Sequence, residues 1–102
     1  MEDKWIVIVN VYAASKKAGA LWRGIESLLK ARGIDYLCHM TGTDGKACEL
    51  AQSAAAEGYR RFVAVGGDGT VHDVLNGIMN YVDSPDAAGS GVAVCDFTLA
   101  VL

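Results

Sequence analysis

The sequence of 102 residues has few basic residues, and they are scattered along the chain. Nine lysines and arginines stand against twelve acidic residues, which gives a net charge of −3 and a pI near 5.2. Because nucleic-acid-binding domains carry a basic patch or stripe, this balance argues against that class of protein. Binding of one phosphorylated small molecule stays open, since it needs only local positive potential.

Paired cysteines and long apolar runs are also missing. The three cysteines are an odd number without a Cys-x-x-Cys pair, so we expect buried, reduced thiols and a cytoplasmic location. No stretch approaches the ~18 apolar residues of a membrane-spanning helix. The acidic start is unlike that of a signal peptide. The expected location is the cytoplasm, for a protein that is either soluble or in contact with the inner face of a membrane from one side only.

What the sequence does contain is a regular alternation of strand and helix patterns. The strands are predicted at 5–11, 35–40, 61–65 and 98–102, the helices at 18–32, 46–57 and 70–81, a loop at 83–91 and a short extended piece at 91–94. Gly33 and Gly58 follow the first two helices as stop signals. This order predicts an α/β fold with parallel strands and helices on both faces of the sheet. Because the sequence stops inside an apolar strand, we expect a fragment of a longer protein.

A glycine-rich segment lies between the third strand and the third helix, in the stretch FVAVGGDGTVHDVLNG. Ligands of open parallel sheets bind beyond the carboxyl ends of the strands. Amides of a helix start attract anions, and the glycines at 66, 67 and 69 permit unusual dihedrals and leave no Cβ to hold a phosphate away. Asp68 beside such a phosphate predicts phosphoryl transfer, either by organising Mg²⁺ or by accepting a proton.

A structural turn is the other interpretation of this segment. Asp-Gly and Gly-Gly pairs are ordinary turn pairs, and Asp68 or Thr70 could cap the following helix. Thr70 and Asp73 have the spacing of a capping box. Other nucleotide signatures, Gly-x-x-x-x-Gly-Lys-Ser/Thr and Gly-x-Gly-x-x-Gly, are missing. The residues alone leave both interpretations open.

The stretch VAVGGDGTVHDVLNG resembles the signature of the diacylglycerol kinase catalytic domain, which sphingosine, ceramide and bacterial lipid kinases share. More distantly, GGDG is similar to NAD kinases and phosphofructokinases. A strand ending in Asn10, Thr41 at the second loop and Ala47 six residues later also occur in family order. The resemblance implies a three-layer α/β/α, Rossmann-like domain, followed in the family by a β-sandwich domain that these 102 residues lack.

The resemblance also implies a reaction, the transfer of the γ-phosphoryl of ATP to a lipid hydroxyl with Mg²⁺. Asp68 would be the carboxylate nearest the chemistry, and no residue is assigned as a direct metal ligand. Asn76 and Gly77 match the family's Asn-Gly, which we expect to serve helix packing. The residues that would line the nucleotide phosphates are Asn10, Thr41, Gly66, Gly67, Asp68, Gly69 and Thr70.

Two departures from the family pattern leave alternatives open. The family's Asn-Pro-x-Ser/Ala-Gly is Asn10-Val11-Tyr12-Ala13-Ala14 here, and its Glu after GGDGT is Asp73. An NAD kinase-like enzyme, or a non-catalytic nucleotide-binding or interaction module, are the alternative functions. We expect the 102 residues alone to be inactive, because the lipid site would lie mostly in the missing half.

Overall fold

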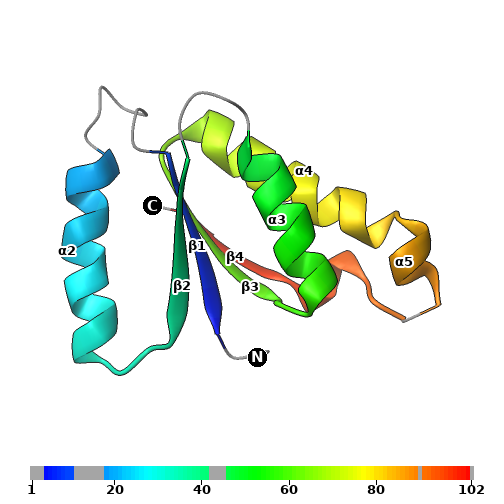
Figure 1. The fold of residues 1–102 in the computed structure, drawn as a ribbon, viewed down its shortest axis with the longest axis horizontal. Helices are drawn as coiled ribbons and strands as arrows, with labels where there is room; N and C mark the ends of the chain where they lie inside the picture. The colour runs from blue at the N-terminus through cyan, green and yellow to red at the C-terminus, as the bar shows by residue number, and fades with distance from the viewer. Residues whose placement is uncertain (1–3, 11–17, 42–45, 90, 102) are drawn as a thin grey trace.

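The computed structural model describes residues 4–10, 18–41, 46–89 and 91–101 (Figure 1). Strands and helices alternate along the chain, as the sequence predicts. The elements are β1 (Trp5–Asn10), α2 (Ala18–Ala31), β2 (Tyr36–Thr41), α3 (Lys46–Glu57), β3 (Arg61–Val65), α4 (Asp68–Val82), the short α5 (Pro85–Ala88), the 3-10 helix η1 (Val94–Asp96) and β4 (Thr98–Val101). The predicted bounds of α3 and β3 are those of the structure, and those of α2, β2 and α4 differ by one or two residues. Predictions at residues 11–17, 42–45, 90 and 102 lie outside the described residues.

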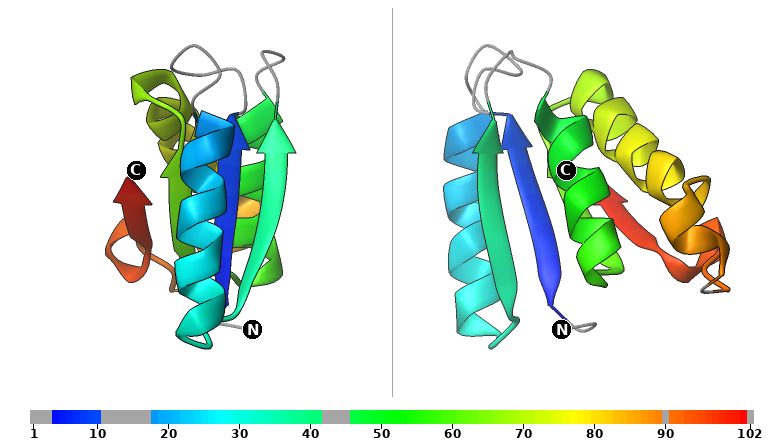
Figure 2. Two further views of the ribbon diagram at one scale, coloured as in Figure 1. Left: turned by 90° about the vertical axis from the view of Figure 1, so that its left-hand side faces the viewer. Right: turned by 45° about the vertical axis from the view of Figure 1, so that its right-hand side comes forward.

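The four strands form one sheet in the order β2-β1-β3-β4, and every neighbouring pair is parallel. Helix α2 lies on one face of this sheet, and α3 and α4 lie on the other (Figures 1 and 2). The predicted three-layer α/β/α architecture is therefore confirmed. Because the strands are parallel, their carboxyl ends meet at one edge of the sheet.

The central strands are buried on both faces, as apolar runs in parallel sheets require. In β1, Ile6 and Ile8 pack towards α3 and α4, whereas Val7 and Val9 pack towards α2. All four side chains are at most 1% exposed, and so is Trp22, which brings α2 onto the sheet. This alternation explains why the sequence of β1 is a continuous apolar run.

Two helices end at glycines with a left-handed backbone, as predicted. Gly33 has φ 68°, and Gly58 has φ 111°. At the end of α2 the amide of Ile34 donates to the carbonyl of Leu29 at 3.0 Å, and that of Gly33 donates to Lys30 at 3.2 Å. This pair of bonds is the Schellman arrangement, which satisfies the last carbonyls of a helix and favours glycine.

The two helices on one face cross closely at Gly77 of α4. A Cβ added there would collide with the carbonyl oxygen of Cys48, lie 2.7 Å from the Cβ of Ala51 and lie 2.9 Å from the amide nitrogen of Gln52. The expectation that Gly77 serves helix packing is confirmed. This crossing holds the start of α3 against the middle of α4.

The apolar stripes of two helices are only partly covered, and the expectation of buried cysteines is wrong. Leu75 and Met79 follow the helical period of α4 but are 43% and 36% exposed, and Leu28 of α2 is 59% exposed. Periodicity gives the width of an apolar stripe, whereas the neighbouring elements decide how much of it is covered. Cys95 is exposed, and Cys38 and Cys48 are only partly buried; all three are free thiols.

The segment between α4 and β4 is also more regular than predicted. The predicted loop contains α5, which begins with Pro85 after an extended Ser84, because proline suits a first helical position. The predicted extended piece at 91–94 overlaps η1 instead. There the carboxylate of Asp96 accepts a hydrogen bond from the amide of Ala93 at 2.9 Å, which stabilises the turn.

Candidate functional site

The predicted site residues come from separate segments and meet at the carboxyl edge of the sheet. Asn10 and Thr41 are the last residues of β1 and β2, and they are paired in register. Val65, the last residue of β3, pairs with Val9, so Gly66 leaves the sheet beside the end of β1. Helix α4 begins two residues further on (Figure 1). The topology therefore groups residues that are up to 60 positions apart.

Helix α4 begins at Asp68, two residues earlier than predicted, with Gly67 as its N-cap residue. The amide of Val71 donates the first helical hydrogen bond, to the carbonyl of Gly67 at 3.0 Å. No side chain caps this helix start. Amides before the first helical bond have no acceptor inside a helix, so those of Asp68, Gly69 and Thr70 are available to an anion.

This geometry removes the capping interpretation of the glycine segment. Asp68 and Thr70 are the first and third residues of the helix, whereas an N-cap residue precedes it. A capping box from Thr70 to Asp73 is wrong for the same reason. The Asp68 carboxylate instead lies in the first turn, where the positive end of the helix dipole favours a negative charge.

Packing within the described residues does not explain Gly67 and Gly69. A Cβ added to either residue would meet nothing within 4 Å in that part of the chain. Neither residue has a left-handed backbone, and Gly67 is fully extended, with φ 178°. The expectation of unusual dihedrals is therefore wrong for Gly66, Gly67 and Gly69. What remains is the bare main chain itself, which lets a group outside the described residues approach closely.

The predicted site residues differ in how accessible they are. Gly67, Asp68 and Gly69 are exposed. Thr41 and Thr70 are only 7% and 4% exposed. The Thr41 hydroxyl donates a long hydrogen bond of 3.5 Å to the carbonyl of Val9, which ties the end of β2 to β1. The two threonine side chains are therefore nearly buried at this edge, whereas residues 67–69 form its exposed surface.

Magnesium fits this edge only in company with a phosphate ligand. The described part of the chain contains no group of three or more His, Cys, Asp and Glu residues that could hold a metal ion. Mg²⁺ usually keeps several waters and is bound through one or two carboxylates together with substrate phosphates. The exposed carboxylate of Asp68, beside open amides, matches that manner of binding.

Fold and edge together define the class of protein, an α/β protein with an uncapped helix start at the carboxyl edge of a parallel sheet. Residues 4–95 match the sequence model of the diacylglycerol kinase catalytic domain. The chain belongs to this family. In the described part of the chain, no helix has the length and apolar character needed to cross a membrane.

Two relatives carry provisional names as lipid kinases. The chain is 32% identical to YtlR of Bacillus subtilis (strain 168) over 82 residues, which are 78% of this chain and 26% of that protein. It is 39% identical to a YegS-like protein of Pseudomonas fluorescens over 56 residues, which are 55% of this chain and 18% of that protein. The chain thus spans about a quarter or less of the length of these relatives.

Proposed function

We propose that this chain is the nucleotide-binding part of an ATP-dependent lipid kinase, and that it presents the phosphates of ATP to a lipid hydroxyl. Membership of the diacylglycerol kinase catalytic domain family and the names of the two relatives support a lipid kinase. The observation that carries the phosphate site is the open main chain at Gly67 and Gly69, where nothing in the described chain requires glycine.

The chain's own groups would act by positioning and by charge. The open amides at the start of α4 would accept phosphate oxygens, as helix starts do in other phosphate sites. Mg²⁺, when bound with ATP, would neutralise charge between the phosphates. The exposed Asp68 carboxylate would orient the waters of that ion or take the proton of the lipid hydroxyl.

The acceptor site belongs to the proposal for the whole protein. The described edge offers backbone and the exposed carboxylate of Asp68, and the family resemblance implies a β-sandwich domain after this one. We expect the cleft between such domains to hold the lipid, with the whole protein touching the membrane surface peripherally. The 102 residues alone are then expected to lack lipid kinase turnover.

The test uses the intact protein that carries this sequence, with labelled ATP, Mg²⁺, and diacylglycerol, a sphingoid lipid or NAD as separate acceptors. We expect label in a lipid. We also expect Asp68→Asn to lower the rate by at least about a hundredfold, the lower range for loss of an acid–base group. Asp83→Asn is the matched control, because Asp83 is an exposed aspartate at the other end of α4.

Each outcome decides between the alternatives. Label in NAD and in no lipid would identify an NAD kinase-like enzyme and contradict the lipid reading of the site. Nucleotide binding without label in any acceptor would identify a non-catalytic module. Full turnover by Asp68→Asn would show that Asp68 takes no part in catalysis.

A further inference from the structure

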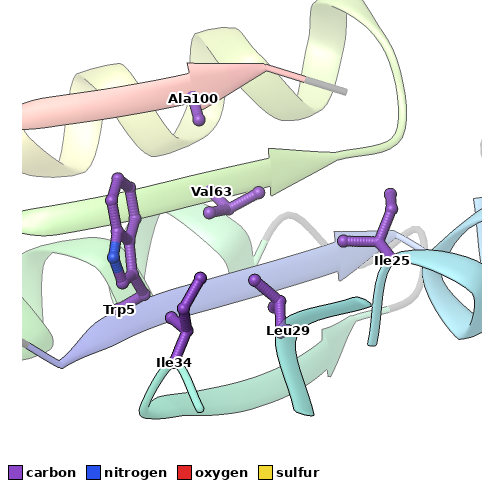
Figure 3. A pocket seen from close by; sticks show the side chains of 6 residues that line it. All are labelled: Trp5, Ile25, Leu29, Ile34, Val63 and Ala100. Atoms are coloured by element: carbon purple, nitrogen blue, oxygen red, sulfur yellow. The ribbon is translucent and has the colours of Figure 1, made fainter. Parts of the chain in front are cut away.

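The face of the sheet that carries α2 has an apolar hollow, called here the β4 hollow. Its volume is about 230 Å³, and it lies between α2, the link to β2 and the strands β1, β3 and β4 (Figure 3). The side chains that line it are those of Trp5, Ile25, Leu29, Ile34, Val63 and Ala100. Every one of them is apolar.

The hollow exists because the two faces of the sheet are covered unevenly. Helices α3 and α4 pack together on one face, whereas α2 alone lies on the other (Figure 2). Two contacts hold α2 towards the β2 side: Trp22 and Tyr36 stack edge to face at 5.6 Å, and the Tyr36 hydroxyl donates to Glu26 at 2.7 Å. Parallel strands are normally buried on both faces, but no helix of the described residues covers β3 and β4 on this one.

The rim of the β4 hollow is apolar and exposed as well. Leu21 and Leu28 of α2 are 51% and 59% exposed. Leu28 lies three residues after Ile25, which lines the hollow, so both side chains belong to the same flank of the helix. Contiguous exposed apolar surface of this kind marks a place where another element packs.

A second hollow, beside the other edge strand β2, has polar side chains in its lining. Its volume is about 180 Å³, and it lies between β2 and α3. It includes the side chains of His39, Ser53 and Glu57 among its lining. An edge strand normally needs such polar groups or some other protection. The β4 hollow has none, so its exposure is not explained by its place near an edge.

We propose that an apolar segment of the same protein, from outside residues 1–102, packs into the β4 hollow and against its rim, Leu21 and Leu28. The lengths of the relatives favour an intramolecular occupant: the matched stretch is 26% of YtlR and 18% of the YegS-like protein, so most of each relative lies outside it. The opposite face of β4 has room for neighbouring elements too, since Val101 is 57% exposed. This inference does not depend on the proposed kinase activity.

Hydroxyl-radical footprinting of the intact protein, analysed by mass spectrometry, tests the proposal with two leucines of equal intrinsic reactivity. Leu28 is 59% exposed and Leu37, on β2, is 39% exposed, so an open hollow predicts faster labelling of Leu28. A seated segment predicts the reverse order, with labelling of Leu28 slowed several-fold. Faster labelling of Leu28 than of Leu37 would overturn the proposal.

The same experiment at several protein concentrations separates the occupants. Protection of Leu28 in a monomer, as measured by light scattering, supports a segment of the same chain. Protection that disappears on dilution, together with a dimer, would assign the hollow to a second copy and overturn the proposal.

A matched pair of variants gives an independent readout. Leu28→Lys and Met40→Lys replace apolar residues that are 59% and 60% exposed. If the hollow is covered, the first lowers the melting temperature of the intact protein and the second does not. Equal melting temperatures for the two variants would contradict the proposal.

Discussion

The close crossing of α3 and α4 predicts that Gly77→Ala, which adds one methyl group, destabilises the protein. In Gly77→Ala the new Cβ would meet the Cys48 carbonyl oxygen and lie 2.7 Å from the Cβ of Ala51 and 2.9 Å from the Gln52 amide nitrogen. Two of these three atoms are backbone atoms of a helix, so they cannot rotate away. Overpacking of this kind costs about 1–3 kcal/mol, and we take about 3 kcal/mol because the backbone must shift.

Alanine also has a higher helix propensity than glycine, and this offsets part of the cost of Gly77→Ala. The gain is about 1 kcal/mol, which leaves a net loss of about 2 kcal/mol. For a domain of this size, that loss lowers the melting temperature by about 8–16 °C. Thermal unfolding followed by circular dichroism measures the shift directly.

The control for this prediction is the same substitution at Gly24, in the interior of α2. A Cβ at Gly24 would meet nothing within 4 Å, so only the propensity term remains. Gly24→Ala should therefore raise stability by about 1 kcal/mol. If Gly77→Ala were as stable as Gly24→Ala, the close helix crossing would be wrong.

Two further predictions concern side chains that hold the layers together. The hydrogen bond to Glu26, then burial, raises the pKa of Tyr36 from 10.0 to about 12, so the stability that this bond adds is present below pH 10 and is lost as the pH rises through 12. The difference in melting temperature between wild type and Tyr36→Phe should shrink over that range, and a constant difference would contradict the bond. Arg60 donates to two backbone carbonyls at 2.9 Å and lies 4.8 Å from the ring centre of Phe97. Arg60→Met should cost about 2 kcal/mol in urea unfolding, against less than about 0.5 kcal/mol for the exposed Arg23→Met, and equal costs would refute this role.

The architecture could be predicted from the sequence because its signals are local and strong. Helix α3 begins after a turn and ends at Gly58, whose φ of 111° suits glycine and few other residues. The apolar run of β1 predicts a strand buried on both faces, and four buried residues confirm it. Alternation of the elements then leaves parallel pairing as the natural topology.

The start of α4 could not be placed from the sequence, because two glycines at its entrance have low helix propensity. The structure shows that Gly67 is an extended N-cap residue and that Gly69 is already helical. Nor could sequence separate glycines needed for packing, such as Gly77, from those with open space, such as Gly67. That distinction depends on neighbours from other segments of the chain.

Which of the predicted site residues are exposed could not be predicted from the sequence either. Thr41 and Thr70 carry hydroxyls that suit phosphate binding, yet both side chains are nearly buried under the edge of the sheet. Their burial depends on which elements pack against the end of β2 and the start of α4. That packing is a property of the tertiary structure. The exposed positions, Asp68 among them, are the ones where a ligand can make contact.

Calorimetric titration of the intact protein with ATP and Mg²⁺ tests the phosphate site most directly, with Gly67→Ala compared with wild type. Because a Cβ at Gly67 meets nothing and its φ of 178° suits any residue, the variant should melt like wild type. Gly24→Ala is the matched control for binding. We expect Gly67→Ala to weaken ATP binding by about tenfold or more, a change of about 1.4 kcal/mol, while the control binds normally. Unweakened binding by Gly67→Ala, or no binding by wild type, would contradict this expectation.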